Sequence, residues 1–301
     1  MLSKLLRHEF RATGRIMLPV YALLLVSCGG CTLFGSLLGR YPESTVLSVV
    51  QTVFATLFGV TTFGMLLLTL VLMVYRFYKN LMTDEGYLMF TLPVSRSQLI
   101  WSKLLVALVW SVLSTVLAAL AWMAEISVVG RENVFSLIAQ GLRSLRQHLS
   151  GNLTGCAAAL VVLCLVSCLV SFLKFYAAIS LGHSFSNHKI LLSVVFYIGF
   201  GIITQTIGTI FASVGIQIDI SPDFWSSLPV TQVFSSLAWA AAGVSALLGA
   251  AYYVLTLLML KKRLNLQYSP AALPPVLSKR QGRRRFFCGV PQGLVPAGNH
   301  R

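Results

Sequence analysis

The chain has 301 residues, of which 56% are hydrophobic and only 10% are charged, and its mean hydropathy is +0.81. Soluble domains carry about 25% charged residues, so this composition excludes a soluble globular protein and indicates a membrane protein. The net charge of +15 comes from 23 Lys and Arg against 8 Asp and Glu. In a membrane protein such an excess marks topology and contact with anionic lipid headgroups, so we expect the lipid bilayer and no nucleic acid as a partner.

The N-terminal segment, residues 1–15, is predicted to form an amphipathic elbow helix that lies in the headgroup layer. Its basic residues recur on one face: Lys4, Arg7, His8, Arg11 and Arg15. Glu9 breaks the pattern, because a helical wheel places it among the leucines of the opposite face. Two interpretations stay open: Glu9 pairs with a basic residue at the end of a span, such as Arg76 or Lys103, or its side chain reaches water. Arg7, Glu9 and Arg11 are the candidate site residues of this helix.

Six apolar runs are long enough to cross a bilayer, which needs roughly 20 mainly apolar residues. They lie at about 16–39, 50–75, 104–126, 155–178, 190–213 and 234–260. The predicted fold class is therefore an all-α membrane protein with six transmembrane helices in one membrane domain, residues 1–266. A basic, Pro-rich tail follows at 267–301 and is predicted to be disordered.

The placement of the basic residues predicts the orientation of the chain. If the N-terminus lies in the cytoplasm, 18 of the 23 Lys and Arg fall on the cytoplasmic side. This matches the positive-inside bias of membrane proteins. We expect a multi-pass protein of the plasma (cytoplasmic) membrane with both termini in the cytoplasm.

The polar segment between the second and third runs carries the most informative pattern. Asp84 and Glu85 stand in the first turn of a short predicted helix, where the helix dipole favours acidic residues. Pro93 disfavours helix at the residue before it and limits this helix to about two turns. Ser95 and Gln98 have the spacing of a capping box, which starts the next helix. A short helix that presents apolar side chains at a membrane face is predicted to bind another protein; these side chains are Tyr87, Leu88, Met89 and Phe90.

Motifs for chemistry within the chain are absent. The sequence contains no phosphate-binding Gly-x-x-x-x-Gly-Lys-Ser/Thr loop, no His-Glu-x-x-His helix and no nucleophile elbow. Ionisable residues inside spans usually mark ion or proton pathways, but Lys174 and Glu125 stand near span ends, within predicted reach of water. We predict a non-catalytic subunit with no metal and no cofactor of its own.

Several stretches resemble the membrane-spanning permease subunits of type-2 ABC transporters, the exporter class of bacteria. They lie at 6–21, at 80–104, at 176–182 together with Lys189, and at 261–266, and the most specific is Glu-Gly-Tyr-Leu-Met-Phe-Thr-Leu-Pro-Val-Ser at 85–95. The resemblance implies an N-terminal elbow helix, six spans and a cytoplasmic coupling helix between spans two and three. It also implies a homo- or heterodimer of permeases bound to separate ATP-binding subunits, which hold the ATP and Mg²⁺.

Carried over by position, the resemblance places the ATPase-coupling contact on Asp84, Glu85, Gly86, Tyr87, Leu88 and Phe90. The turn and helix cap that follow fall on Pro93, Ser95 and Gln98. The implied function is the permease of an ATP-driven exporter, with a drug, an antimicrobial peptide or a lipid-like molecule as substrate. Two alternatives stay open: a membrane sensor or assembly protein that uses the same loop only for docking, and an ATP-independent channel or carrier.

Overall fold

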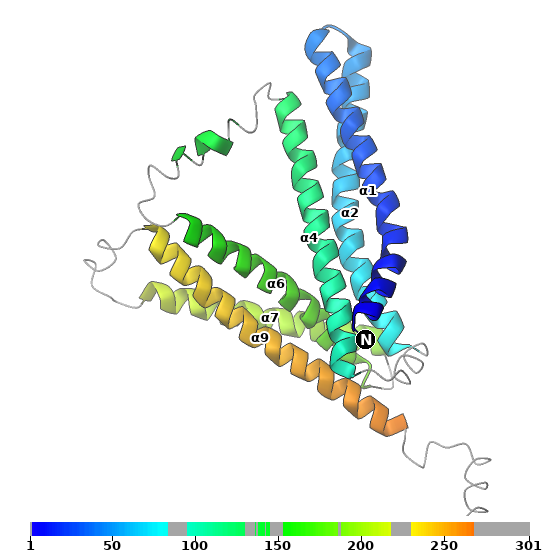
Figure 1. Ribbon diagram of the computed structural model, residues 1–301, viewed down its shortest axis with the longest axis vertical. Helices are drawn as coiled ribbons and strands as arrows, with labels where there is room; N and C mark the ends of the chain where they lie inside the picture. The colour runs from blue at the N-terminus through cyan, green and yellow to red at the C-terminus, as the bar shows by residue number, and fades with distance from the viewer. Residues whose placement is uncertain are drawn as a thin grey trace, which may run out of the picture. The chain divides into compact units, whose positions relative to one another are not determined.

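The computed structural model describes residues 2–83, 95–129, 153–185, 188–217 and 230–267, together with 136, 138–141, 143 and 144. The long elements among these residues are six α-helices, and no strand occurs among them. They are α1 (Leu2–Arg40), α2 (Thr45–Met82), α4 (Arg96–Val129), α6 (Leu153–Gly182), α7 (Lys189–Gln217) and α9 (Val230–Gln267) (Figure 1). Each is long and apolar enough to cross a membrane, which confirms the predicted all-α class and the six spans.

The basic N-terminal segment and the first apolar run form one continuous helix, α1. At 1.5 Å per residue a 39-residue helix extends about 58 Å, roughly twice the thickness of the hydrocarbon core. A straight helix of this length already projects beyond the bilayer without a turn. Pro19 lies inside α1 and removes one backbone hydrogen bond without ending the helix.

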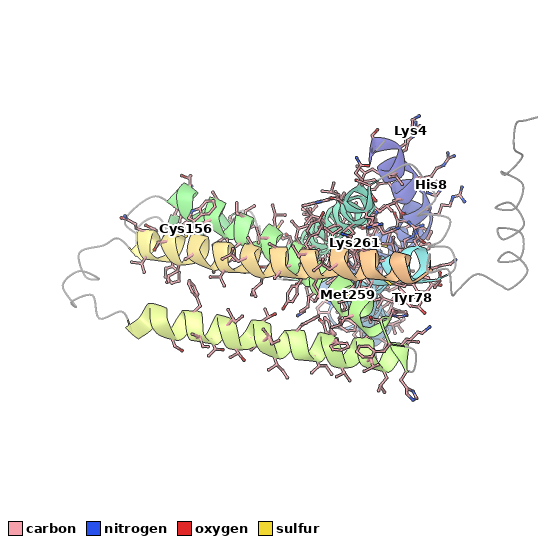
Figure 2. All side chains as sticks on the ribbon, turned by 90° about the horizontal axis from the view of Figure 1, so that it is seen from below. Lys4, His8, Tyr78, Cys156, Met259 and Lys261 are labelled. Carbon is pink, nitrogen blue, oxygen red and sulfur yellow. The ribbon has the colours of Figure 1, made fainter. Side chains whose placement is uncertain are left out.

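The predicted polar face of the N-terminal segment is exposed. Lys4, Arg7, His8 and Arg11 are all solvent-exposed, and Figure 2 shows Lys4 and His8 projecting away from the neighbouring helices. The segment is helical, as predicted, and its position in the headgroup layer as an elbow remains a prediction.

One stripe of α1 is buried against α2 and α4. Its members recur at intervals of three and four residues: Glu9, Thr13, Met17, Tyr21, Leu24, Cys28 and Cys31. This spacing keeps one face of a helix in contact with its neighbours along its whole length. The three helices lie side by side, with α2 antiparallel to α1 and α4 parallel to it (Figure 1).

Hydrogen bonds between hydroxyl groups link the three helices in their interior. Tyr21 of α1 bonds Ser114 of α4 at 2.8 Å, and Ser114 bonds Thr69 of α2 at 2.9 Å. Ser27 of α1 also bonds Thr61 of α2 at 2.8 Å. Such links specify how membrane helices align, because a polar group in hydrocarbon has few other partners.

The helices α6 and α7 pair as a hairpin. Tyr197 of α7 stacks on Phe175 of α6 with ring centroids 4.2 Å apart, and the Lys174 ammonium lies 4.9 Å from the Tyr197 ring centre. Tyr176 joins this hairpin to α2, since its fully buried ring stacks on Phe77 with centroids 3.8 Å apart.

Two tyrosines of α9 connect it to other helices. Tyr253 bonds Ser97 of α4 at 2.6 Å and also contacts the ring of Trp101. Tyr252 bonds Thr204 of α7 at 2.8 Å. Each tyrosine packs its ring in an apolar contact and bonds a polar side chain of a neighbouring helix through its hydroxyl group.

The chain divides into two compact units, residues 1–257 and 258–301, with the boundary inside α9. The boundary falls ahead of the predicted start of the tail at 267. Residues 268–301, which make up nearly all of that tail, lie outside the described residues, so its disorder remains a prediction.

We predict that Gly182→Ala disrupts the α6–α7 hairpin. A Cβ atom on Gly182 would lie 2.6 Å from the backbone nitrogen of Ser193 and 2.7 Å from its Cα, and backbone atoms cannot move aside cheaply. The expected cost is about 1–3 kcal/mol, as for other overpacking substitutions, seen as a lower melting temperature in detergent.

Gly199→Ala is the matched control on α7, because a Cβ atom there meets nothing within 4 Å. This control is expected to be neutral or slightly stabilising, since alanine is the better helix former. Equal melting temperatures for the two variants would contradict the close approach at Gly182.

Candidate functional site

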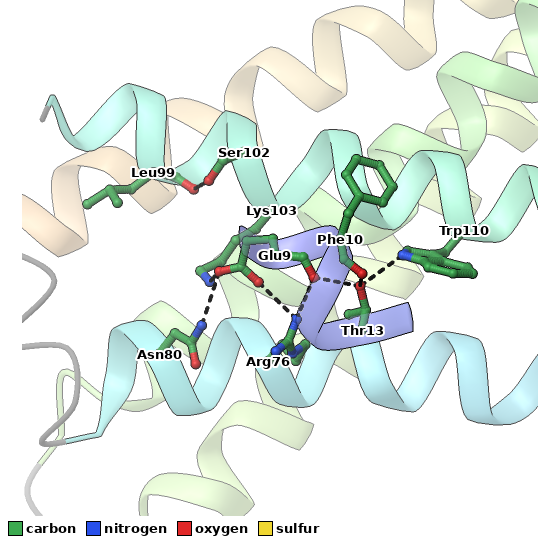
Figure 3. Close-up of polar contacts among 9 residues, drawn as sticks. All are labelled: Glu9, Phe10, Thr13, Arg76, Asn80, Leu99, Ser102, Lys103 and Trp110. Atoms are coloured by element: carbon green, nitrogen blue, oxygen red, sulfur yellow. Dashed lines mark hydrogen bonds and ion pairs between the residues drawn. The ribbon is translucent and has the colours of Figure 1, made fainter. Parts of the chain in front are cut away.

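Glu9 lies at the centre of a buried polar cluster that joins α1, α2 and α4 (Figure 3). Its Oε1 atom is 2.7 Å from Lys103 Nζ and accepts a hydrogen bond from Asn80 Nδ2 at 3.2 Å. Its Oε2 atom is 3.1 Å from Arg76 Nη1. The side chains of Glu9 and Lys103 are only 5% and 4% exposed, so both charges lie away from water. Of the two interpretations of Glu9, the structure shows the ion pair, with both of the named basic residues at once.

The backbone of α1 takes part in the same cluster. The carbonyl oxygen of Glu9 accepts hydrogen bonds from Arg76 Nη1 at 3.0 Å and from the Thr13 hydroxyl at 2.7 Å. Thr13 in turn accepts a bond from the indole Nε1 of Trp110 at 2.9 Å. One turn of α1 is therefore held by α2 on one side and by α4 on the other. We call Glu9, Thr13, Arg76, Asn80 and Lys103 the Glu9 cluster.

The Glu9 cluster carries one more positive than negative charge, because one carboxylate faces a guanidinium and an ammonium. Arg76 is the least enclosed member, with 21% of its side chain exposed, so part of its charge is hydrated. The Lys103 ammonium has little contact with water, and the Glu9 carboxylate balances its positive charge. Removal of one partner from a buried pair leaves an uncompensated charge, which is strongly destabilising.

The cluster lies at the end of the helices where α1 begins, α2 ends and α4 begins; we call this the basic end. Arg76 and Asn80 belong to the last two turns of α2, and Lys103 to the second turn of α4. These two helix ends flank the segment 84–94. A single carboxylate on α1 thus binds both flanks of that segment.

The predicted coupling residues Asp84, Glu85, Gly86, Tyr87, Leu88 and Phe90, and the turn residue Pro93, lie outside the described residues. The predicted start of the next helix is described. Ser95 Oγ accepts from the Gln98 backbone N–H at 3.3 Å, and the Ser95 N–H donates to Gln98 Oε1 at 3.4 Å. These are the two reciprocal bonds of a capping box, and α4 begins at Arg96 directly after them.

Of the candidate residues on the N-terminal helix, only Glu9 joins the buried cluster. Arg7 and Arg11 are exposed on the opposite face. Sequence reasoning missed Asn80 and the pair of Thr13 and Trp110. Thr13 stands four residues after Glu9, so the same helical wheel would have placed it on the buried face.

Glu125 corrects the sequence-based interpretation of the span ends. Its predicted position near the end of a run suggested contact with water, but the residue is 6% exposed. The helices α1 and α2 continue past this level and cover it, which an apolar run by itself does not reveal.

One comparison with known proteins found a family match, which covers about a third of the chain. Residues 84–186 match the family described as ABC-2 family transporter protein. The matched region begins in the segment that the Glu9 cluster flanks and continues through α4 and α6. Neither the search of curated proteins nor the search of solved structures found a match.

The family match and the six apolar helices together support a membrane permease of a type-2 ABC transporter, as the sequence resemblance implied. Permeases of this family are transport components that associate with an ATP-binding subunit and are generally non-catalytic.

We predict that Glu9→Gln lowers the stability of the full-length chain by about 3 kcal/mol, because Lys103 is left buried without its carboxylate. The measurement is thermal unfolding in detergent micelles. Adding Lys103→Met to Glu9→Gln is expected to recover much of the loss, since the unpaired buried ammonium is then gone.

Glu43→Gln serves as the control, because Glu43 is exposed at the opposite end of α1 and α2. Equal stability of Glu9→Gln and Glu43→Gln would show that the buried ion pairs do not hold the three helices together.

Proposed function

We propose that the chain is the permease subunit of an ATP-driven exporter and that the basic end receives force from a separate ATP-binding subunit. In this account the basic end faces the cytoplasm, and segment 84–92 forms the coupling helix that contacts the partner. Two permeases assemble with two ATP-binding subunits, which supply ATP and Mg²⁺. ATP-driven closure of the partner subunits moves the coupling segment and changes the packing of the spans.

The observation that carries this proposal is the attachment of α1 to both flanks of segment 84–94 through one buried carboxylate. A force on that segment reaches the end of α2 and the start of α4. Glu9 bonds Arg76 and Asn80 at the end of α2 and Lys103 near the start of α4, so a movement of either helix end also moves α1. The three helices then move as one body rather than separately.

A cavity of about 400 Å³ between α2, α6 and α7 supports an amphipathic substrate. Its walls are almost entirely apolar, with Val71, Val74 and Val194 among them. Its lining residues with polar groups include Tyr75, Tyr78 and Tyr197. Such a cavity suits a drug, peptide or lipid-like molecule with a large apolar part.

The test of the proposal is co-purification of the chain with its ATP-binding partner in mild detergent, followed by ATPase and vesicle transport assays. Tyr87→Ala and Glu85→Lys are expected to lose the partner, because they alter the proposed contact. Glu9→Gln is expected to keep the partner and its ATPase activity but to transport less substrate per ATP hydrolysed. Glu43→Lys, a charge reversal at the opposite end, is expected to change neither.

A homo-oligomer without any ATPase partner would overturn the proposal in favour of a channel or carrier. A bound ATPase partner with no substrate flux in vesicles would favour the sensor or assembly protein.

We predict that Val194→Trp reduces transport several-fold by filling the α2–α6–α7 cavity. Val195→Trp is the matched control: both valines are 53% exposed, but only Val194 lines the cavity. The measurement is the initial rate of substrate efflux in reconstituted vesicles. If both variants transport equally well, the cavity lies off the substrate path.

A further inference from the structure

A second polar cluster lies between α1, α2 and α4, far along these helices from the Glu9 cluster. It contains Glu125 of α4, Gln51 of α2, and Cys28 and Cys31 of α1. Gln51 Nε2 donates to the Cys31 sulfur at 3.5 Å, and both thiols lie close to the Glu125 carboxyl group. The Cys28 thiol donates to the carbonyl oxygen of Ala121 at 3.8 Å. We call these residues the Glu125 cluster.

Two oxygen atoms of the Glu125 cluster are buried and have no hydrogen-bond partner. They are Oε1 of Glu125 and Oε1 of Gln51. Glu125 also forms no salt bridge with any described residue. A buried carboxyl group with an unused oxygen is costly, and an ionisable side chain inside a membrane domain commonly marks a binding site. Both atoms accept hydrogen bonds, so a molecule that binds to them must be a hydrogen-bond donor.

A cavity of about 610 Å³ adjoins this cluster. It is lined by Gly35, Ser36, Leu38, Gly39 and Arg40 of α1, Gln51 of α2 and Val128 of α4. Because Gly35 has no side chain, a narrow gap remains between α1 and the side chains of Gln51 and Val128. A Cβ atom at Gly35 would lie 3.2 Å from Gln51 Nε2 and 3.5 Å from Val128 Cγ1. Val128 stands three residues after Glu125 on α4, so the cavity reaches the turn of α4 that follows Glu125, and Gln51 is the member of the cluster that lines it.

We propose that the Glu125 cluster binds the primary ammonium group of an amphipathic molecule. An ammonium group is compact and carries three N–H donors, two of which match the unpartnered oxygens of Glu125 and Gln51. A metal ion is the weaker candidate, because the described residues hold no group of three or more His, Cys, Asp or Glu side chains placed to bind one. Binding an ammonium would supply a charge partner for Glu125 and a donor for Gln51 at the same time.

Arg40 refines the ligand class. It lines the same cavity five residues beyond Gly35, about 7 Å farther along α1. A guanidinium in the lining of the same cavity repels a simple cation but pairs well with a phosphate. A phosphoethanolamine headgroup, with an ammonium next to a phosphate, therefore fits better than an alkyl amine alone.

The test is direct binding to the purified full-length chain in a maltoside detergent, with no ATPase partner present. The probes are short-chain phosphatidylethanolamine, short-chain phosphatidylcholine and dodecylamine. Phosphatidylcholine is the matched control probe, since it keeps the phosphate and the positive charge but has no N–H donor. We expect it to bind roughly tenfold or more weakly than phosphatidylethanolamine.

Glu125→Gln and Gly35→Leu are each expected to weaken phosphatidylethanolamine binding by about tenfold or more, the first by removing the carboxylate and the second by filling the approach. Glu43→Gln is the control, because Glu43 is an exposed acidic residue between α1 and α2, at the same end of these helices as the Glu125 cluster. This variant is expected to bind phosphatidylethanolamine like the wild type. Melting curves without ligand verify that each variant is folded.

Equal affinities of the wild-type chain for phosphatidylethanolamine and phosphatidylcholine would overturn the proposal, and this comparison needs no variant. Unchanged binding by Glu125→Gln would overturn it as well. If both tests support the proposal, the dodecylamine affinity identifies the ligand. Dodecylamine that binds as tightly as phosphatidylethanolamine indicates that the ligand is a free amphiphilic amine. Much weaker dodecylamine binding identifies the lipid headgroup. Because the assay uses the permease alone, its result does not depend on ATP-driven transport.

Discussion

The buried carboxylate of Glu9 is the constraint on which the arrangement of α1, α2 and α4 depends. Its two oxygens face an ammonium at 2.7 Å and a guanidinium at 3.1 Å. Among the described residues, neither cation forms a salt bridge with any other carboxylate. A shift of α1 by one turn would move Glu9 by about 5 Å and leave buried charges unpaired. The ion pairs therefore fix the axial position of α1 against both neighbours.

Ion pairs of this kind contribute more to selecting one packing arrangement than to overall stability. Apolar residues of similar volume often replace a buried pair with little loss, whereas the loss of one partner is expensive. We infer that the Glu9 cluster ensures that α1 meets α2 and α4 in one register. The hydroxyl links through Tyr21, Ser114 and Thr69 continue the same alignment farther into the bundle. The Glu125 cluster lies at the far end of the same buried stripe, where Cys28 and Cys31 are members.

Sequence reasoning found the features that depend on local pattern. The apolar runs located all six helices, and Glu9 stood out because a carboxylate on an apolar helix face needs a partner. The Ser95–Gln98 spacing located the start of α4. The C-terminal end of α2 was missed, because the helix continues to Met82, well past the end of the apolar run near residue 75.

The burial of Glu125 and the role of Asn80 could not be predicted from the sequence, because both depend on which helices contact one another. Position within a run suggested that Glu125 reaches water, yet its burial follows from the lengths of α1 and α2 beside it. Asn80 carries no signal of its own, since an asparagine near a helix end is ordinary. Its role appears only when α1 is placed against α2, so that its amide meets Glu9.

Hydrogen–deuterium exchange of the chain in lipid nanodiscs, comparing the wild type with Glu9→Gln, tests the central claim most directly. If Glu9 holds both flanks of segment 84–94, backbone exchange will increase at the end of α2, residues 76–82, and at the start of α4, residues 96–103. Exchange around Tyr21 and Ser114 in the middle of the bundle will change little. An increase confined to α1, or no increase on either flank, would contradict the account.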